Sequence, residues 1–203
     1  METLIKSFKD AFPKLSLEND LDELTDIIDV ERISLNSDKD VVTIYISSHQ
    51  WLHRKNLLRL EQAIKTQLFK GYKIAIMIKE RFILSSQYTP KHFYDSYKNS
   101  MMFELSEKSP ILSHLFKRAE IKFSDGQITV IVPDMGIYKE KENELTEYLE
   151  FVFNKRCSFN IRIFLKINAE LNDTLFETDK TNDEFEERLK SITTGIEKKE
   201  TEK

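Results

Sequence analysis

The sequence contains very little cysteine, glycine or proline. Its single cysteine, Cys157, cannot form an internal disulfide, and such scarcity is typical of a reducing compartment. With 4 glycines and 4 prolines among 203 residues, long flexible linkers are not expected. No apolar run approaches the roughly 18 residues of a membrane span, and charges scattered through residues 1–12 argue against a signal peptide. The composition therefore predicts a cytoplasmic protein with no membrane partner.

Motifs for phosphate binding, metal binding and nucleophilic catalysis are also missing. The glycines form neither G-x-G-x-x-G nor a Walker A loop, and no G-x-x-G occurs. His49 and His53 have the spacing of a zinc-binding pair on a helix, but no third ligand is evident. Cys157 is not part of a motif that pairs it with a histidine. We therefore expect no catalytic residue, metal or cofactor in this chain.

Charge is unevenly distributed, although the net charge is only −4. Residues 1–48 carry 11 acidic and 5 basic side chains, and the segment from Glu170 onward has a net charge of −5. Residues 49–81 carry 8 basic and 2 acidic side chains, a net of +6. A basic middle between acidic ends is suited to contact with an anionic partner.

The hydrophobic pattern predicts the order strand, hairpin, strand, helix, strand twice. In the first copy, strands are expected around 33–35, 41–46 and 72–82, with an amphipathic helix at 57–68. In the second copy, strands are expected at 121–123, 128–132 and 159–167, with a helix at 145–152. Asp125-Gly126 predicts a type I′ hairpin turn in the second copy.

Helices are expected before each copy. The apolar residues Leu4, Ile5, Phe8 and Phe12 predict one at the N-terminus, and Thr89-Pro90 and Ser109-Pro110 are helix starts with proline at the first position. The predicted fold class is α+β, with two small ββαβ units whose three-stranded, mostly antiparallel sheets are covered by helices. Without a G-x-x-G loop, a KH-like fold would be a degenerate one.

These features together resemble the N-terminal region of the PolC-type DNA polymerase III alpha subunit of low-GC Gram-positive bacteria. The resemblance lies in the order, spacing and apolar pattern of several segments. They are LENDLDELTDIIDVERISLNSDKDVVTIYISS, LLRLEQAIKTQLF, YKIAIMIKERF, SPILSHLFKRAEIKFSDGQITVIVPD and FNIRIFLKIN. The resemblance implies an NI-like domain at 1–86, an NII-like domain with bridging helices at 87–169, and a charged tail or linker at 170–203.

In that family the OB-fold, PHP, exonuclease and polymerase parts lie further along the chain, and no position here matches their metal-binding carboxylates. The resemblance therefore implies a non-catalytic accessory role in DNA replication, in the cytoplasmic, nucleoid-associated replisome. Implied partners are replisome proteins, clamp-loader subunits among them, and the rest of the same polymerase chain. A small stand-alone enzyme is a further alternative.

A basic zone at residues 53–81 is the candidate contact for an anionic partner. With the tryptophan before it, the candidate residues are Trp51, His53, Arg54, Lys55, Arg59, Lys73, Lys79 and Arg81. Basic residues beside an aromatic ring suit single-stranded DNA, through phosphate contacts and base stacking. An acidic protein surface, including the acidic ends of this chain, is the other partner considered. Lys73 and Lys79 are both expected to face solvent on the third strand.

Overall fold

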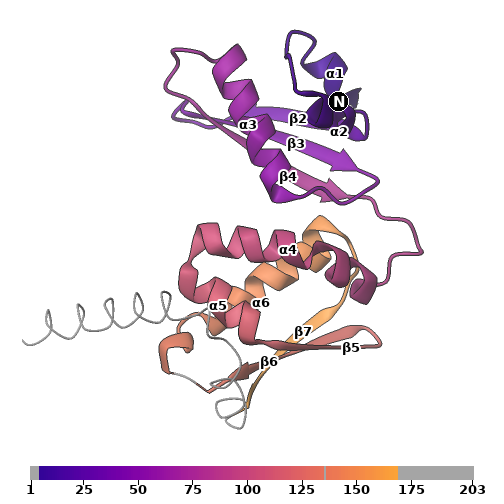
Figure 1. Cartoon of the computed structure of the whole chain (residues 1–203), viewed down its shortest axis with the longest axis vertical. Coiled ribbons are helices and arrows are strands. Elements are labelled where there is room, and N and C mark those ends of the chain that lie inside the picture. The colour runs from indigo at the N-terminus through magenta and orange to yellow at the C-terminus, as the bar shows by residue number, and fades with distance from the viewer. Residues whose placement is uncertain (1–4, 135, 169–203) are drawn as a thin grey trace, which may run out of the picture.

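The computed structural model describes residues 5–134 and 136–168, so Leu4 and the expected tail at 170–203 lie outside the described residues. The elements follow the predicted order in two units (Figure 1). The first unit contains β1 (Lys6–Ser7), α1 (Phe8–Ala11), α2 (Asn19–Thr25), β2 (Ile28–Leu35), β3 (Val41–Ser48), α3 (Arg54–Leu68) and β4 (Ala75–Phe82). The second contains α4 (Pro90–Lys108), α5 (Pro110–Arg118), β5 (Glu120–Ser124), β6 (Gln127–Pro133), the 3₁₀ turn η1 (Gly136–Tyr138), α6 (Glu142–Glu150), the π-helical turn η2 (Phe151–Arg156) and β7 (Arg162–Asn168).

The first sheet has the strand order β1-β2-β3-β4, with two antiparallel pairs followed by a parallel pair. It has four strands rather than the expected three because Lys6 and Ser7 pair with Val30 and Asp29. The expected N-terminal helix is correspondingly replaced by β1 and the short α1. Ser7 ends the strand and caps α1, because its hydroxyl accepts the backbone N–H of Asp10 at 3.1 Å.

One face of the first sheet is covered by α3. Leu57, Leu60 and Ile64 are fully buried on this helix and pack in the same core as Ile44 and Ile78 of the sheet. Burying such side chains is the main source of stability for a small sheet, which needs a helix on one face. The apolar stripe predicted from the sequence is therefore the packing face of α3.

The second sheet has the order β5-β6-β7, antiparallel then parallel, and so repeats the pairing of β2, β3 and β4. Ser124 pairs with Gln127, which leaves Asp125-Gly126 as a two-residue turn. Gly126 has a φ of 68°, but Asp125 is not among the residues with positive φ. A type I′ turn needs positive φ at both positions, so that prediction is wrong.

Helix α4 lies between the two sheets (Figure 1). Its Tyr97 packs edge-on against Phe82 of β4, with ring centroids 5.7 Å apart, while its Tyr94 lies 5.4 Å from Phe123 of β5. The buried apolar side chains of both units accordingly form one hydrophobic cluster. Within residues 5–134 and 136–168, no helix is both long and apolar enough to cross a bilayer.

Candidate interaction surface and the junction between the units

The fold divides the predicted basic zone between the two sides of the first sheet. Trp51 and His53 precede α3, and Arg54, Lys55 and Arg59 lie on it. Lys73 lies before β4 rather than on it, since the strand begins at Ala75. Lys79 and Arg81 alternate along β4 with the buried Ile78, Glu80 and Phe82 and so point away from α3. The eight residues are therefore not brought together on one surface.

Arg54 is held inside the chain. Its Nη2 forms a 2.9 Å ion pair with Glu61 Oε1, and its Nη1 donates to the carbonyl of Ile78 at 3.3 Å. The same Glu61 oxygen accepts the backbone N–H of Ile78 at 2.7 Å. The side chains of Arg54 and Glu61 are 20% and 12% exposed. This arrangement ties α3 to β4 and occupies the guanidinium.

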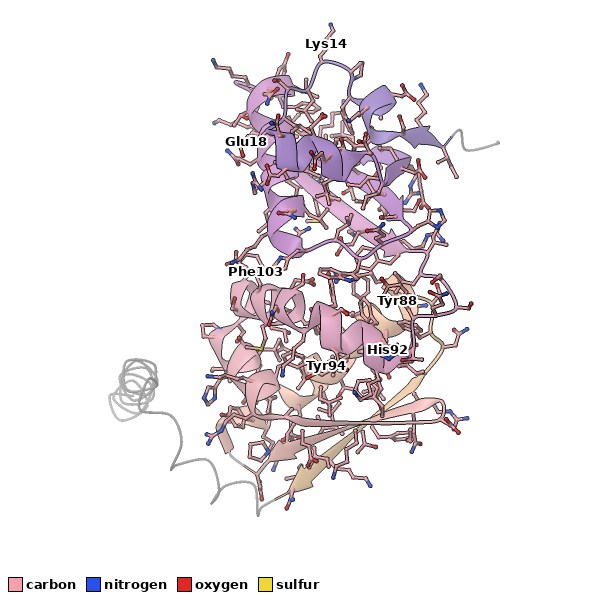
Figure 2. The ribbon with its side chains drawn as sticks, turned by 45° about the vertical axis from the view of Figure 1, so that its right-hand side comes forward. Lys14, Glu18, Tyr88, His92, Tyr94 and Phe103 are labelled. Atoms are coloured by element: carbon pink, nitrogen blue, oxygen red, sulfur yellow. The ribbon has the colours of Figure 1, made fainter. Side chains whose placement is uncertain are left out.

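Arg59 faces the acidic N-terminal segment. Its two terminal nitrogens lie 2.5 Å from Glu18 and Asp20 (Figure 2 labels Glu18 beside α3). The hydrogen bond from Arg59 lowers the pKa of Asp20, and those carboxylates raise the pKa of Arg59. The positive charge of Arg59 is thus balanced by two carboxylates of the same chain.

Trp51 and His53 are partly buried at the junction between the units. The Trp51 ring meets Tyr97 of α4 edge-on at 5.8 Å, so it packs on the core. His53 is the N-cap of α3, because its Nδ1 accepts the backbone N–H of Lys55 at 3.1 Å. Burial and then the charge of Lys55 lower the pKa of His53, which favours the neutral ring that this bond requires.

Lys55 and Lys73 are exposed. Lys55 Nζ lies 5.2 Å from the ring centroid of Phe103, which Figure 2 shows on the part of α4 nearest the first unit. This distance is within the range of cation–π attraction, roughly 6 Å. Of the residues on or before α3, Lys55 is thus the cation most available to a partner.

A second group of cations surrounds Tyr45 on the open face of the first sheet, the face opposite α3. Tyr45 on β3 pairs in register with Arg32 on β2 and with Lys79 on β4. Arg32 Cζ lies 4.0 Å and Lys79 Nζ 5.9 Å from the Tyr45 ring centroid. Tyr45 therefore has a cation beside it on each neighbouring strand.

This face is also hollowed. A shallow hollow of about 420 Å³ is lined by Ile5, Glu31, Arg32, Tyr45 and Arg81. Its volume lies in the range of sites that accept small molecules, roughly 300–1,000 Å³. Arg81 forms an ion pair with Glu31 at its edge. The hollow thus lies beside two arginines and a tyrosine ring on the open face.

Sequence reasoning missed Arg32 and Tyr45. Tyr45 was predicted within a strand, and its alternation with Ile44 and Ile46 was the available signal for an outward ring. Arg32 gave the opposite signal, because alternation from Ile28 and Val30 would direct it inward. A β-bulge between Val30 and Arg32 reverses the alternation and turns Arg32 to the open face.

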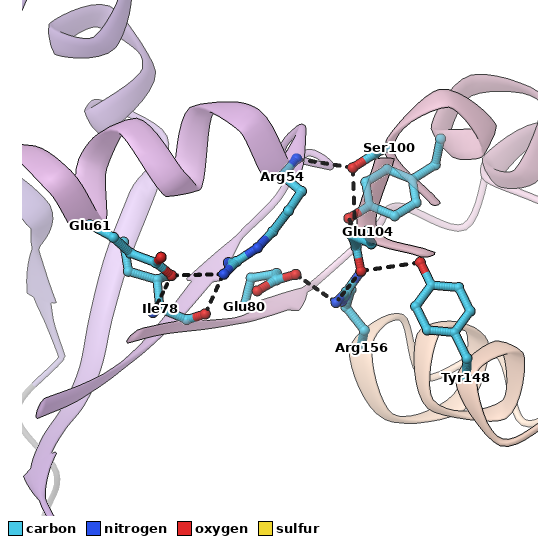
Figure 3. A network of polar contacts seen from close by, with 9 residues as sticks. Arg54, Glu61, Ile78, Glu80, Ser100, Glu104, Tyr148 and Arg156 are labelled. Atoms are coloured by element: carbon cyan, nitrogen blue, oxygen red, sulfur yellow. Dashed lines mark hydrogen bonds and ion pairs between the residues drawn. The ribbon is translucent and has the colours of Figure 1, made fainter. Parts of the chain in front are cut away.

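A buried ionic cluster lies where the units meet (Figure 3). It joins Glu80 of β4, Glu104 of α4 and Arg156 of η2. Arg156 donates from Nη1 to Glu104 Oε1 at 2.9 Å and from Nη2 to Oε2 at 3.1 Å. Its Nη2 also lies 2.8 Å from Glu80 Oε1, and the side chains of Arg156 and Glu80 are only 6% and 4% exposed. The cluster is an internal link between the two units.

Hydroxyl groups extend this cluster. Tyr97 donates to Glu104 Oε1 at 2.8 Å and accepts from Arg156 Nη1 at 2.9 Å, while Tyr148 donates to Glu104 Oε2 at 3.1 Å. Ser100 Oγ accepts the backbone N–H of Arg54 at 2.9 Å and so connects α4 with the first turn of α3 (Figure 3). Burial raises the pKa of Tyr148 far above its usual range, which keeps its hydroxyl protonated as a donor.

Glu80 occupies a position where the strand pattern predicts an apolar side chain, since Ile78 and Phe82 on either side are buried. An acid at that position was the available signal for a buried charge. Burial raises the pKa of Glu80, while Arg156 opposes the shift. Glu80 Oε1 accepts no hydrogen bond of standard geometry, although it lies in an ion pair with Arg156 Nη2. Arg156 Nε likewise has no acceptor among the described residues.

The histidine pair and the cysteine do not form reactive sites in the described structure. His49 and His53 both precede α3, so they are not on one helical face as the spacing suggested. No group of three or more His, Cys, Asp or Glu side chains able to hold a metal occurs within the described parts of the chain. Cys157 is buried, and burial raises the pKa of its thiol to about 12, which disfavours the reactive thiolate.

Comparison with known proteins gives one assignment. No curated protein and no solved structure showed significant similarity to the chain. A family model does match the first unit, from Ser7 in β1 to Ile78 in β4. That model is described as DNA polymerase III polC-type N-terminus I. Residues 7–78 therefore match the family of N-terminal region I of PolC-type DNA polymerase III, a replication polymerase.

Proposed function

We propose that the chain is a non-catalytic N-terminal accessory region of a PolC-type replicative polymerase and serves as a docking module for other replisome proteins. Its partners would be clamp-loader subunits and the rest of its own polymerase chain, in the cytoplasmic, nucleoid-associated replisome. The domain limits that accompany this proposal are 1–86 and 87–169, followed by a charged linker at 170–203. The role in DNA replication is supported by the family model that matches residues 7–78.

The docking proposal rests on one observation: several side chains of the predicted basic zone are bound to other residues of the same chain. Trp51 packs on Tyr97, Arg54 is bound to Glu61, and Arg59 is bound to Glu18 and Asp20. These side chains hold elements of the chain together, so they are poorly placed to contact a nucleic-acid backbone. Such internal pairs support a scaffold role for α3.

Exposed apolar side chains support docking to a protein. Ile33 and Leu35, at the end of β2, are 49% and 51% exposed. Burial of such side chains against a partner is favourable and depends only weakly on ionic strength. A partner that covered the end of β2 would therefore remain bound at salt concentrations that disrupt phosphate contacts.

The test is calorimetric titration of the chain with purified clamp-loader subunits at about 50 mM and about 200 mM salt. Binding should persist at the higher salt and be weakened by Leu35→Asp. Phe164→Asp, which changes a comparably exposed apolar residue on the second sheet, is the matched control. Absence of binding to these subunits at both salt concentrations would contradict the docking proposal for this class of partner.

A second candidate function, binding of single-stranded nucleic acid, is favoured by a specific observation. The open face of the first sheet places three cations, Arg32, Lys79 and Arg81, near the Tyr45 ring and the hollow beside it. Cations beside an aromatic platform are the combination that such modules use.

A further inference from the structure

We infer that the open face of the first sheet is a binding site for single-stranded nucleic acid, in which Arg32 and Lys79 contact phosphate and Tyr45 contacts a base. The inference rests on the second candidate function and gives it a site. That site lies on the face of the sheet opposite α3. Most residues of the predicted basic zone lie instead on α3 or just before it.

The availability of the cations on this face is the first argument. Arg32 and Lys79 are exposed, and neither forms a salt bridge or hydrogen bond with another side chain in the described parts of the chain. Arg54 and Arg59, in contrast, are each bound to carboxylates. A cation without a carboxylate partner can contact a phosphate without first breaking an ion pair.

The position of the ring is the second argument. Tyr45 lies on β3, an inner strand of the sheet, with Arg32 and Lys79 on the flanking strands. Bases stack on aromatic rings and on arginine planes, whereas phosphates bind the cations beside them. The Arg32–Tyr45 stack at 4.0 Å therefore offers a planar surface next to positive charge.

The charge and shape of the face favour a nucleic acid over an acidic peptide. The face carries Arg32, Lys79 and Arg81, with Glu31 bound to Arg81 and Asp29 in register with Ser47. This small positive excess would attract an acidic peptide only weakly. A nucleotide uses the ring and the hollow as well as the charge, because both its base and its phosphate find a matching group.

The test is fluorescence anisotropy of the full chain with a labelled oligothymidylate of about 12 nucleotides. Binding should be measurable at low salt and weaken steeply as salt is added. Tyr45→Leu should weaken binding at least about fivefold, whereas Tyr45→Phe, which keeps the ring, should stay within about twofold. Lys79→Gln and Arg32→Gln should each reduce the slope of log K against log salt concentration by about 0.7.

Lys55→Gln and Lys73→Gln are the matched controls, because each removes one exposed positive charge outside this face. Both should leave affinity within about twofold. Circular dichroism of every variant checks that the fold is kept, and Lys79→Gln tests the site even if Tyr45→Leu unfolds.

Each contrary result has a separate meaning. Equal losses in the control and face variants would overturn this site but leave nucleic-acid binding intact. Absence of binding by the unmodified chain at low salt would overturn both the site and the second candidate function. Polyglutamate that displaced the oligonucleotide at equal charge would show that the face accepts acidic protein, and would also overturn the inference. The first two results do not bear on docking, which is measured with protein partners.

Discussion

The two units have the same strand order and pairing, but their crossover helices differ. In the first unit, α3 is a regular helix of 15 residues. In the second, the 9-residue α6 continues directly as η2, a π-helical turn of 6 residues. A π turn holds more residues per turn than an α-helix, so it shifts the side chains that follow it around the axis. Within η2 itself, Val152, Phe153 and Arg156 are all buried.

The difference determines where each unit places its arginines. Arg59 of α3 remains 40% exposed beside surface carboxylates, whereas Arg156 of η2 is 6% exposed and reaches Glu80 of the other unit. π turns often occur at sites with a special role. Here the role is structural: the second unit supplies the buried link, and the first unit supplies the charged surface.

Removal of Arg156 should have the largest effect on this comparison. Arg156→Met would leave Glu80 and Glu104 buried without their cation, and breaking a buried pair in this way costs about 3–5 kcal/mol. Urea unfolding measures the loss. Arg162→Met, at the exposed start of β7, is the control and should change stability by less than about 0.5 kcal/mol. Equal effects of the two substitutions would show that the junction contributes little.

Cys157 should report whether η2 opens independently. Burial raises the pKa of its thiol from 9.0 to about 12, so the thiolate population is roughly a thousandfold lower than for a free thiol. Native protein at pH 8 should therefore react slowly with a disulfide reagent, and at an ordinary rate in denaturant. Arg156→Met should speed the native reaction. Equal rates in native and denatured protein would contradict the buried position.

Glu80 should make the stability of the junction depend on pH. Because burial raises its pKa above 4.5 in the folded state, the folded protein takes up a proton before the unfolded chain does. The contribution of Glu80 to the free energy of unfolding is therefore fully present below the pKa of the unfolded chain. It is lost as pH rises through the pKa of the folded state, by at most about 1.4 kcal/mol per pH unit. The free energy of unfolding of the wild type relative to Glu80→Gln should thus fall as pH rises above 4.5.

Glu120→Gln, at an exposed position on β5, controls for the loss of one surface carboxylate. A difference between wild type and Glu80→Gln that rose with pH would contradict the assigned direction, since it would mean that Arg156 outweighs burial.

Substitution of Arg59 should have the smallest effect. Arg59→Ala removes an exposed pair of contacts to Glu18 and Asp20, and such surface ion pairs contribute little and are screened by salt. Its effect on urea unfolding should be well below that of Arg156→Met and should shrink as salt is added. Lys55→Ala is the control on the same helix. An Arg59→Ala loss as large as that of Arg156→Met would remove the distinction between surface and junction.

Much of the fold could be predicted from local patterns. The N-caps Thr89 and Ser109, each followed by proline, mark the starts of α4 and α5 as expected. The N-terminal helix was only partly predicted: α1 forms at Phe8–Ala11, but Lys6–Ser7 form β1 through pairing with β2, a contact between distant residues. The candidate site was less predictable. Positive charge along residues 49–81 is visible in the sequence, but the partners of Arg54 and Arg59 are not.

The sequence by itself determined the order of the elements and the two repeated units, because hydrophobic periodicity is a local property of the chain. Only the tertiary structure decided which side chains reach the open face and the junction. Periodicity assigns faces by counting residues, and the β-bulge before Arg32 and the π turn that contains Arg156 each alter that count. Pairing and packing across the fold stabilise both irregularities, and so the positions of these two arginines depend on contacts that the local sequence does not contain.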